Sequence, residues 1–395
     1  MSDAPRRLRI AVLNRVFAAT GGGAERYSMA LVEQLAPRHD IHVFAQEIRH
    51  RWPGVVYHAV SAPWSRSRWL NQLWYASVTW WRTRQGFDLV HSHENTWHGQ
   101  VQTVHVLPVR YNLFHGRTGS SRVLRWLKVL VSPRLMAYLG LERSRFALRD
   151  DRTIIAISST LMAQVASAYP AVVQRLVLLT PGVKLNSGAS TSLQKIEARR
   201  RLGLPQTDRY VLFVGNDYRK KGLRALIRAL ALLPDDVSLA VVGRGEHRDE
   251  FEALAATLGV ANRVRFLGTL DDVEDAYVAA DCLAHPTLED TFAMVVLEAL
   301  AHALPVVVSG SKYCGISALL RHETNALILE EPRDSAVLAS ALARIFQDDA
   351  LSSALRAGAL AFAAQYHWPA IASLQEEIYF STLRAEASGG VTDSA

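Results

Sequence analysis

Short runs of β-branched and other apolar residues alternate along the chain with longer stretches whose apolar positions recur at helical spacing. This alternation is typical of parallel sheets built from βαβ crossovers, and it predicts an α/β protein. In the first half, the predicted strands are 8–14, 41–46, 55–60, 88–93, 101–106 and 153–158. In the second half, they are 210–215, 238–243, 264–268, 282–287, 305–310 and 326–330.

A Ser- and Gly-rich segment, LNSGASTSLQ (185–194), separates the two sets of strands and predicts a linker between two doubly wound, Rossmann-like domains. Such sheets bind ligands beyond the carboxyl ends of their strands, so we expect the reaction in a cleft between the domains. The expected parts are an N-terminal domain, a linker, a C-terminal domain, a helix returning to the N-terminal domain and a disordered tail, over 1–184, 185–196, 197–366, 367–384 and 385–395 respectively.

Composition narrows the class of protein. The 395 residues are 49% hydrophobic and 21% charged, which is typical of a globular protein and not of a disordered or fibrous one. The two cysteines, Cys282 and Cys314, have no partner at metal-ligand spacing, so neither a zinc site nor a disulfide framework is indicated. No apolar run reaches the roughly 18 residues of a membrane-spanning helix, and the run after Arg9 is interrupted too early for a secretory signal. We therefore expect a cytoplasmic protein.

Charge divides the chain into two different halves. Through Lys184 there are 24 Lys and Arg against 10 Asp and Glu, whereas the remainder has 20 against 27. No acidic residue lies between Glu47 and Asp88 or between Glu94 and Glu142. Eight of the nine Trp also lie in the first half. A basic, Trp-rich half indicates an anionic partner for that half.

Three glycines, Gly21, Gly22 and Gly23, follow the first predicted strand and precede a helix expected over 24–36. Backbone N–H groups at the start of that helix would form a site for an anion or a sugar. A flexible turn is the alternative. A dinucleotide-dependent oxidoreductase is disfavoured, because the glycines do not form a G-x-G-x-x-G pattern and no Asp or Glu ends the second strand.

The segment VGNDYRKKGLRALIRAL (214–230) combines glycines with a cluster of cations. Gly215 ends a predicted strand, and Arg219, Lys220 and Lys221 follow it in the loop before an amphipathic helix. Cations at the carboxyl end of a strand suit a diphosphate, whose charge they would stabilise as it departs. A solvated run of cations is the alternative, but the position on a doubly wound domain favours the phosphate site.

The segment HPTLEDTFAMVVLEALAHALPVVVS (285–309) carries carboxylates around the start of a predicted helix. Glu289 and Asp290 lie in the loop, and Glu298 lies about two turns along the helix. Asp290 and Glu298 would accept hydrogen bonds from sugar hydroxyls at one end of a ligand and from ribose hydroxyls at the other. The alternative for Glu298 is a surface position, but its apolar neighbours predict a buried helix, in which an unpaired Glu is costly.

Histidines concentrate near the ends of two successive strands in the first half, at His91, His93, His98 and His105. Zinc is disfavoured, because no His-x-x-x-His pair on a helix and no nearby Cys accompanies them. We expect His105 to reach into the cleft and to polarise or hydrogen-bond a substrate group, with a pKa near its ordinary value. A hydrogen-bonded core histidine is the alternative.

Together these segments resemble family 4 glycosyltransferases of the GT-B fold, among them transferases of lipopolysaccharide-core and lipid-linked glycans. The resemblance covers most of the chain, and the 285–309 segment is its most specific part. The other matching segments are GGGAERYSMALVEQLA (21–36), DLVHSHEN (88–95), TVHV (103–106), TPGV (180–183), KKG (220–222), LAVVGRGE (239–246) and VRFLG (264–268). The resemblance implies transfer of a sugar from a nucleotide-diphospho-sugar, without a cofactor or metal and with retention of anomeric configuration.

The resemblance places the nucleotide-sugar donor on residues of the second half. Glu298 would bind the nucleotide ribose. Asp290 and the backbone of Thr291, Phe292 and Ala293 would bind the donor sugar. Ala293 replaces the Gly that is usual after this Phe in the family, and we expect its methyl group to restrict the donor pocket.

The diphosphate is placed against the cationic loop that follows Gly215. Lys221 would hold the diphosphate. Either Arg219 or Lys220 would supply a second cation, because Asn216 stands where the family often has Arg. Catalysis would then be mostly electrostatic, and no side-chain nucleophile is expected.

In the first half, the resemblance places His105 near the donor sugar, and Gly21 to Gly23 beside the phosphates and the acceptor. The first carboxylate of the family's E-x7-E pattern is Asp290 here, with Glu289 directly before it. Both carboxylates therefore stay candidates for that position.

The acceptor side is suggested by the basic, Trp-rich half. Segments 64–84 and 122–139 mix Arg with aromatic and aliphatic residues, in the manner of helices lying on an anionic membrane surface. We expect this domain to dock on the inner face of the cytoplasmic membrane and to reach a lipid-linked or lipopolysaccharide-type acceptor. The alternative is that the aromatic residues are buried in the domain core. Nucleic acid is disfavoured, since no nucleic-acid-binding module is present.

Two other functions are alternatives to sugar transfer. One is a sugar-nucleotide epimerase or hydrolase on the same fold, which would turn over the donor without an acceptor. The other is a nucleotide-sugar-binding protein without turnover. The joint presence of Lys221, Asp290, Glu298 and His105 disfavours the second alternative.

Overall fold

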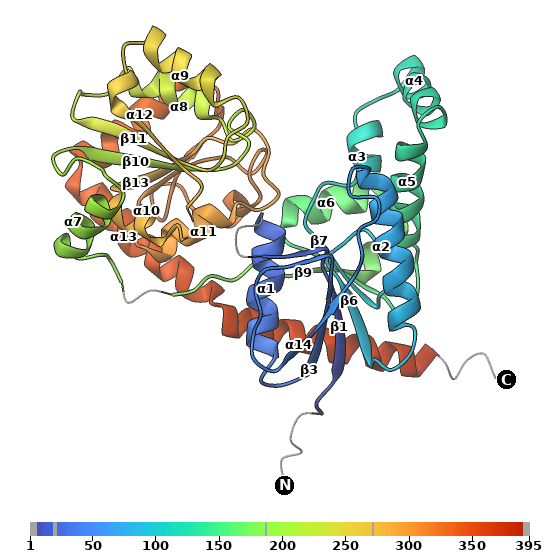
Figure 1. Cartoon of the computed structure of the whole chain (residues 1–395). Coiled ribbons are helices and arrows are strands. Elements are labelled where there is room, and N and C mark those ends of the chain that lie inside the picture. Colours follow the sequence, from blue (N-terminus) through green and yellow to red (C-terminus); the bar gives the residue numbers. More distant parts are fainter. Residues whose placement is uncertain (1–5, 19–21, 186–187, 271, 390–395) are drawn as a thin grey trace. The chain divides into compact units, whose positions relative to one another are not determined.

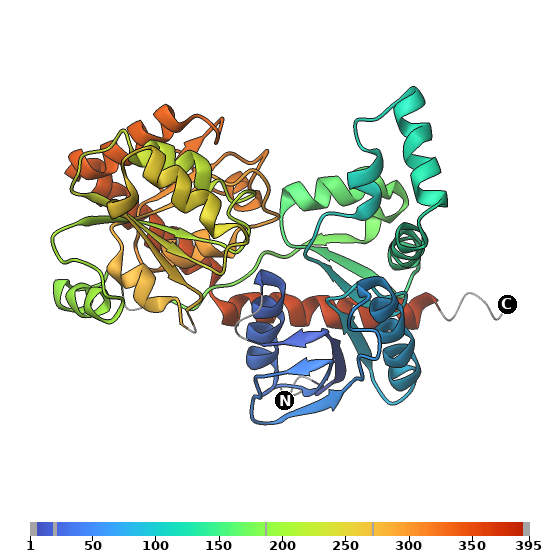
Figure 2. The same ribbon diagram turned by 45° about the horizontal axis from the view of Figure 1, so that its top comes forward.

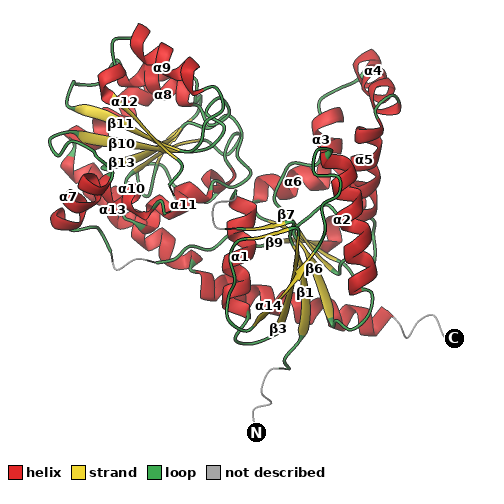
Figure 3. Ribbon diagram, in the orientation of Figure 1, coloured by secondary structure: helices red, strands yellow, loops and turns green. Residues whose placement is uncertain are grey.

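The structure, a computed structural model, describes residues 6–18, 22–185, 188–270 and 272–389. The chain forms two compact units, and each is described by itself. The N-terminal unit comprises Met1–Pro181 with Trp368–Ala395, and the C-terminal unit comprises Gly182–His367. In each unit, helices cover a parallel sheet (Figure 3). The predicted α/β class with two doubly wound sheets is confirmed.

The sheet of the N-terminal unit has the strand order β5-β3-β1-β6-β7-β8-β9, with each neighbouring pair parallel (Figure 1). Its strands are β1 (Arg9–Leu13), β3 (Asp40–Ala45), β5 (Val55–Ala59), β6 (Leu89–Ser92), β7 (Val101–Val104), β8 (Thr153–Ala156) and β9 (Leu176–Leu178). All predicted strands of the first half are confirmed within two residues at each end. A small additional sheet pairs β2 (Val16–Phe17) with β4 (Glu47–Ile48), which the sequence did not indicate.

The helices of the N-terminal unit are α1 (Gly23–Leu35), α2 (Arg68–Thr83), α3 (Val109–Phe114), α4 (Gly119–Leu130), α5 (Pro133–Arg145), α6 (Ser159–Ala168), η1 (Pro170–Arg175) and α14 (Trp368–Gly389). Local sequence explains two of their starts. Ser158 caps α6, because its hydroxyl accepts a hydrogen bond from the Leu161 amide. Segment 122–139 is broken into α4 and α5, because Pro133 fits the first turn of a new helix capped by Ser132.

One hydrophobic cluster of the N-terminal unit lies between α2 and the strands β1, β3 and β6. Leu13 and Phe44 from the sheet pack with Tyr75 from α2 and Val90 from β6. The Tyr75 hydroxyl donates to the Phe44 carbonyl at 2.7 Å, so its polar end is satisfied inside the core.

The last helix, α14, belongs to the N-terminal unit, where it packs against α1 (Figures 1 and 2). Glu376 forms an ion pair with Arg38 at 2.6 Å, and the Tyr379 hydroxyl lies 2.7 Å from Nδ1 of His91. The helix continues to Gly389, so the expectation of a disordered tail from residue 385 is wrong over that stretch. The last residues of the expected tail, 390–395, lie outside the described residues.

The sheet of the C-terminal unit has the order β12-β11-β10-β13-β14-β15 and is also parallel. Its strands are β10 (Arg209–Val214), β11 (Val237–Val242), β12 (Val264–Gly268), β13 (Cys282–His285), β14 (Val306–Ser309) and β15 (Leu327–Leu329). Its helices are α7 (Ser192–Arg201), α8 (Leu223–Leu230), α9 (Arg248–Thr257), η2 (Ala261–Arg263), α10 (Glu274–Ala279), α11 (Met294–Ala301), η3 (Gly315–Ala318), α12 (Ser335–Gln347), α13 (Asp349–Ala363) and η4 (Ala364–Tyr366). The predicted strands of the second half are confirmed.

Helix α7 corrects the expected linker over 185–196. The Thr191 hydroxyl accepts from the Gln194 amide, while the Gln194 side chain accepts from the Thr191 amide, so the two residues form a capping box. Arg199 on α7 then pairs with Asp281 at 2.9 Å, which ties the helix to the C-terminal unit. The predicted linker therefore overlaps the start of the first helix of that unit, and the boundary along the chain lies between Pro181 and Gly182.

No helix among the described residues combines the length and the apolar composition that crossing a bilayer would need.

Candidate functional site

The strand order of the C-terminal unit marks one crevice at the carboxyl edge of its sheet. From β10 the chain proceeds to β11 and β12 on one side, and then returns to place β13 on the other side. The loops after β10 and β13 therefore leave the sheet in opposite directions, and in doubly wound sheets ligands bind at this switch point. These two loops contain the cations and carboxylates that the sequence singled out.

The two loops are joined by backbone contacts that fix their relative position. The Leu288 amide donates to the Lys220 carbonyl at 2.7 Å, and the Thr287 hydroxyl donates to the same carbonyl at 3.2 Å. Gly222, at φ 81°, lies so close to the second loop that a Cβ atom would be 1.9 Å from the Pro286 carbonyl oxygen. A glycine is therefore required at the point where the loops cross.

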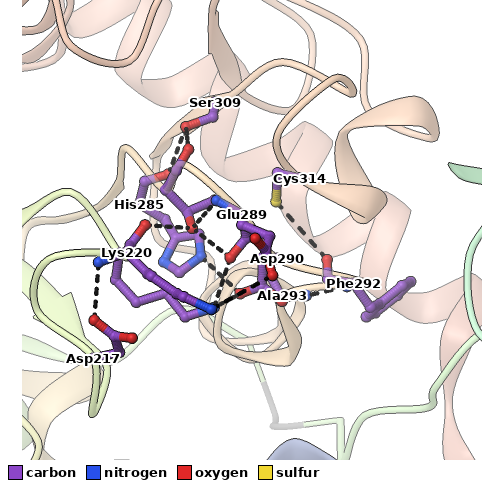
Figure 4. Close-up of polar contacts among 11 residues, drawn as sticks. Asp217, Lys220, His285, Glu289, Asp290, Phe292, Ala293, Ser309 and Cys314 are labelled. Carbon is purple, nitrogen blue, oxygen red and sulfur yellow. Dashed lines mark hydrogen bonds and ion pairs between the residues drawn. The ribbon is translucent and has the colours of Figure 1, made fainter. Parts of the chain in front are cut away.

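Asp290 lies beside His285 and Ala293 (Figure 4), and Lys221 contacts its carboxylate from the other loop. The Lys221 Nζ lies 2.6 Å from Oδ2 of Asp290 and also donates to the Glu289 carbonyl at 3.3 Å. Nε2 of the fully buried His285, at the end of β13, lies 3.1 Å from the same Oδ2. His285 is a site residue that the sequence analysis missed, although it stands directly before the loop in the specific segment.

The electrostatics of this cluster keep the carboxylate charged. Burial alone would raise the pKa of Asp290, but the hydrogen bond from His285 and the charge of Lys221 outweigh it and lower that pKa below its ordinary range. Burial lowers the pKa of His285, while Asp290 opposes that shift. The cluster is thus an ammonium and a carboxylate with a neutral imidazole donating to the carboxylate.

The other oxygen of Asp290 organises the loop before α11. Its Oδ1 accepts from the backbone amides of Phe292, at 3.3 Å, and Ala293, at 2.9 Å. Ala293 has φ 72° and ψ 70°, a left-handed conformation that an alanine adopts only at a cost. The family's usual Gly at this position fits that geometry, because Gly carries no such cost. Thr291 lies half-buried in the same loop.

Glu298 lies on α11, half-buried between apolar neighbours. Its Oε2 accepts a hydrogen bond from the Tyr277 hydroxyl at 2.6 Å. The structure therefore satisfies the partner requirement that the sequence predicted for a Glu on a largely buried helix.

The neighbouring charged residues of the two loops lie further out. Lys220 is exposed and faces Glu289, with 3.6 Å between the charged atoms. Arg219 is exposed and pairs with Glu250 on α9, with a distance of 2.9 Å from its Nε. Since Asp290 is held in the crevice and Glu289 is exposed, the geometry favours Asp290 as the first carboxylate of the pair.

Close packing of two strand ends shapes the floor of this crevice. Gly243 after β11 has φ 128°, and a Cβ atom there would lie 2.1 Å from the Gly215 carbonyl oxygen. The Tyr218 hydroxyl donates to the Gly243 carbonyl at 2.8 Å. The chain after β10, at Gly215, and after β11, at Gly243, therefore places backbone atoms and few side-chain atoms beside Lys221.

The N-terminal unit has its own switch point, between β1 and β6. Arg15, just after β1, pairs there with Glu94, just after β6, with 2.9 Å between Nε and Oε2. This part-buried ion pair was not predicted, although both residues directly follow strand signals. Gly22 precedes α1 and Gly23 is its first residue, and both are exposed. Gly21 lies outside the described residues.

The predicted histidines mostly gather in the core beside that switch point. Nδ1 of His93 lies 3.0 Å from Nε2 of His105, and the His91 ring lies 4.2 Å from the His93 ring. His105 also packs edge-on against Tyr27. Burial lowers the pKa of His105 to about 3, so the expectation of a pKa near its ordinary value is wrong. His98 does not join this cluster.

Among the described residues, no group of three or more His, Cys, Asp or Glu is arranged to hold a metal ion.

Two family models match consecutive parts of the chain. Residues 21–187 match the model described as glycosyltransferase family 4, and residues 194–361 match the model described as glycosyl transferases group 1. The chain belongs to the family 4 glycosyltransferases. The resemblance drawn from the sequence segments is thereby confirmed.

Curated relatives of this family 4 chain match about half of it. The lipopolysaccharide glucosyltransferase WaaG of Escherichia coli K12 is 29% identical over 208 residues, which are 51% of this chain and 55% of the relative. A D-inositol 3-phosphate glycosyltransferase of Thermobispora bispora is 32% identical over 244 residues, which are 58% of this chain and 56% of the relative. The chain thus spans about half the length of these relatives.

Solved structures establish the fold of the whole chain. The crystal structure of WaaG aligns with a TM-score of 0.80 at 23% identity, covering 94% of this chain and 99% of that one. The structure of Anabaena Alr3699/HepE in complex with UDP and glucose aligns with a TM-score of 0.75 at 20% identity, covering 95% and 100%. The family 4 chain therefore has the GT-B fold of two Rossmann-like domains.

Proposed function

We propose that this protein transfers a sugar from a nucleotide-diphospho-sugar to a membrane-associated glycan or lipid acceptor, with retention of configuration, in the synthesis of a cell-envelope polysaccharide or lipopolysaccharide. Family membership supports the transferase class, and the first relative named above is a lipopolysaccharide glucosyltransferase. The observation that carries the proposal is the contact between Lys221 and Asp290 at the switch point of the C-terminal unit.

The donor would bind by exchanging partners within this contact. A carboxylate has about four lone-pair sites, and those of Asp290 are occupied by Lys221, His285 and the amides of Phe292 and Ala293. A diphosphate attracts Lys221 away from Asp290. The Oδ2 lone pair released in this way can accept a hydroxyl of the donor sugar. Diphosphate binding and sugar binding are thus coupled through one ion pair.

The same cations serve the chemical step. The bond from the anomeric carbon to the diphosphate breaks while the acceptor hydroxyl attacks, and the departing diphosphate carries the growing charge. Lys221, with Lys220 or Arg219 as a second cation, would stabilise that charge. We accordingly propose a reaction without a metal ion or cofactor. Glu298, already oriented by Tyr277, would accept the ribose hydroxyls.

His105 would serve as a neutral hydrogen-bonding group near the donor sugar. Because its pKa is lowered to about 3, the ring is neutral at pH 7 and carries a proton on only one of its two nitrogens. Its Nε2 is 3.0 Å from His93, which orients the ring. Gly22 and Gly23 would place backbone amides at the start of α1 beside the phosphates or the acceptor.

A membrane acceptor is supported by α2, which buries several polar side chains and exposes tryptophans. Asn71, Gln72, Thr79 and Thr83 face the interior, where Asn71 and Gln46 exchange amide hydrogen bonds at 2.8 and 2.9 Å. The exposed tryptophans on or before this helix are Trp64, Trp74, Trp80 and Trp81. For these four tryptophans, the alternative of burial in the core is wrong, whereas Tyr75 of the same helix is buried there.

Helix α4 adds to this surface. Val129 is its buried residue among the described positions Gly119–Leu130, whereas its exposed apolar side chains are Val123, Leu124, Trp126, Leu127 and Leu130. Arg122, Arg125 and Lys128 lie on the same helix, and no acidic residue lies between Glu94 and Glu142. Apolar residues interleaved with cations are typical of a helix lying on an anionic membrane. We propose peripheral docking of this face on the inner surface of the cytoplasmic membrane.

A donor screen tests the function. Purified protein is mixed with UDP-, GDP-, ADP- and dTDP-sugars, and thermal shift and nucleotide release are measured with and without membrane-lipid extract. We expect one donor class to raise the melting temperature and nucleotide release to depend on the extract. Release that ignores the extract contradicts the acceptor assignment, and the absence of a shift with every donor contradicts the transferase assignment.

Two further experiments test metal independence and membrane docking separately. Turnover measured with a metal chelator should match turnover without it, whereas a loss restored by Mg²⁺ would refute the metal-independent step. Sedimentation with anionic and neutral vesicles at low salt tests docking, and equal recovery from both would refute its electrostatic part.

A further inference from the structure

A pocket of about 340 Å³ lies in the N-terminal unit, between the end of α3, the start of α4 and the end of α6. Its wall is formed by the turn that joins α3 to α4. None of the residues proposed above to bind the donor lines it. The pocket adjoins the exposed face of α4, since Phe114 at its edge packs against Trp126 with 4.7 Å between the ring centroids.

The pocket is lined by three arginines and by no carboxylate: Arg110, Arg117 and Arg122. Among the described residues, none of these guanidinium groups forms an ion pair with a carboxylate. Nη1 of Arg117 is buried and has no hydrogen-bond partner. Arg110 and Arg122 are exposed and Arg117 is half-buried, so the unpaired buried atom is Nη1 of Arg117. A buried cationic donor without an anion is costly, and together with the two other arginines it points to an anionic ligand.

The buried carboxylate of Glu142 does not pair with these arginines, because its oxygens already accept hydrogen bonds from other groups. Its oxygens accept from the amides of Val109 and Arg110, at 2.5 and 3.1 Å, and from the Tyr169 hydroxyl at 3.0 Å. The Arg110 guanidinium lies over the Tyr169 ring at 5.1 Å, which leaves its N–H groups available to a ligand.

The backbone adds positive potential to the same place. Thr118 is the N-cap of α4, a helix of 12 residues, and its side chain forms no capping hydrogen bond. The first amides of α4 therefore keep their capacity to donate, and the helix dipole favours a negative charge beside them. Tyr111 and His115 stack at 4.1 Å next to this helix start and provide a flat surface for a ring attached to the anion.

We propose that this pocket binds a phosphate group carried by the acceptor. Planar guanidinium groups match phosphate oxygens two at a time, and three arginines line this pocket together with Thr118, the N-cap of α4. The pocket also has room for part of the sugar or the lipid headgroup that bears the phosphate. This inference rests on the proposed function, because it adds a recognition element to the acceptor of that reaction.

The test is calorimetric titration of the full-length protein with inorganic phosphate and with glucose 1-phosphate. The double variant R117Q/R122Q should bind both ligands at least about tenfold more weakly than the wild type, since each lost charge-assisted contact contributes substantially. The matched control is K128Q/R134Q, which removes the same charge from exposed positions of α4 and α5 outside the pocket. The control should keep wild-type affinity for both ligands.

Vesicles identify the source of the phosphate. Sedimentation is compared for vesicles containing phosphatidic acid and for vesicles with the same molar amount of phosphatidylglycerol, which lacks a terminal phosphate. A loss of phosphatidic acid binding in R117Q/R122Q, relative to K128Q/R134Q, assigns the phosphate to a lipid headgroup. A loss confined to the soluble ligands assigns it to a phosphorylated glycan. Both results support the pocket.

Two results overturn the inference. One is equal phosphate affinity in R117Q/R122Q and the wild type, and the other is an equal loss in the control double variant. R122Q alone, at an exposed position, replaces the double variant if that protein does not fold. A nucleotide-sugar thermal shift in the same samples tests the proposed function separately, because it depends on the C-terminal unit.

Discussion

Helix α8 of the C-terminal unit and helix α4 of the N-terminal unit use similar residues in opposite ways. Helix α8 buries Leu223, Leu226, Ile227 and Leu230 and exposes Arg224 and Arg228. In α4, the leucines are exposed, beside arginines that are also at the surface. The first pattern is what folding requires of a surface helix.

The difference teaches that folding alone does not account for the surface of the N-terminal unit. Each exposed apolar side chain forgoes about 1.5–3 kcal/mol of burial free energy. Helix α2 repeats the pattern with polar residues inside and tryptophans outside. A surface of this kind is explained by a partner that covers it. The C-terminal unit concentrates its unusual features in the loops around Lys221 and Asp290.

The largest expected difference between the units is in how their stability responds to acid. Lowering the pH should destabilise the N-terminal unit more than the C-terminal unit. Burial lowers the pKa of His91, His98 and His105 in the N-terminal unit to about 3 each. The unfolded chain binds these protons near pH 6.5, so below that pH the unfolded state holds more protons than the folded one. Each histidine therefore removes roughly 1 kcal/mol per pH unit as the pH falls from 6.5 toward 3. In the C-terminal unit, Asp290 opposes the corresponding shift of His285.

Urea unfolding followed by tryptophan fluorescence measures this loss, since all nine Trp lie within the N-terminal unit. We expect a drop of several kcal/mol between pH 6.5 and pH 5 in the free energy of unfolding of that unit. His98→Gln should reduce the pH dependence, whereas replacing the exposed His115 with Gln should leave it unchanged. An equal pH dependence in all three proteins would contradict the assignment to buried histidines.

Lys221→Ala should show that chemistry resides in the C-terminal unit. Loss of a cation that stabilises the departing diphosphate lowers turnover by roughly two to three orders of magnitude, or about 3–4 kcal/mol. Vesicle binding should be unchanged, because the docking surface lies in the other unit. Steady-state kinetics and sedimentation on one preparation check both parts, with Arg228→Ala on the exposed face of α8 as the control. Equal turnover in the two variants would refute the role of Lys221.

Leu226→Ala and Leu124→Ala make the opening comparison quantitative. Leu226 on α8 is 1% exposed, so its truncation should lower the free energy of unfolding by about 3 kcal/mol. Leu124 on α4 is 65% exposed, so its truncation should change stability by less than about 0.5 kcal/mol. Tryptophan fluorescence follows the N-terminal unit, whereas far-ultraviolet circular dichroism follows both units, so its change that fluorescence does not report measures the C-terminal one.

Vesicle binding should depend on Leu124 and not on Leu226, which is the reverse of the effect on stability. Leu124→Ala should weaken binding to anionic vesicles, because about 2 kcal/mol of apolar transfer is lost if the side chain enters the interface. Leu226→Ala should leave vesicle binding unchanged. A Leu124 variant that binds vesicles like the wild type would remove α4 from the docking surface.

Periodicity and motifs predicted the sheets well because parallel strands are continuous apolar runs. The same reasoning failed at α7, where composition suggested a linker although Thr191 and Gln194 spell a capping box. Spacing identified Asp290 and Glu298, because both belong to one segment. It could not identify Arg15 and Glu94, whose pairing depends on two strands being neighbours in the sheet.

Burial was the hardest property to predict. The pKa of His105 depends on rings brought to it by other strands and helices, which a single sequence does not reveal. The sequence left two alternatives for the aromatic residues of α2, surface or core, because a helix with tryptophans and polar residues gives the same periodicity whichever side is buried. The left-handed backbone conformation of Ala293 was equally hard to predict, although an Ala where the family usually has Gly indicated an unusual position.

Ala293→Gly should produce the smallest effect and sharpen the account of the C-terminal loops. Replacing the left-handed alanine relieves about 1–2 kcal/mol of strain. It also adds about 0.4–1 kcal/mol of conformational entropy to the unfolded chain, so the net gain in stability should be about 0.5–1 kcal/mol. Thermal unfolding followed by circular dichroism measures this gain.

Ala303 supplies a control at the other end of α11, because it also has a positive φ, of 57°, and no contact with Asp290 among the described residues. Ala303→Gly should therefore stabilise by a similar amount. The two variants should differ only in donor binding, since the amide of Ala293 donates to Asp290 and Ala293 belongs to the loop proposed to hold the donor sugar. If both variants change donor affinity equally, the effect comes from α11 as a whole, and the Ala293 loop loses its special role.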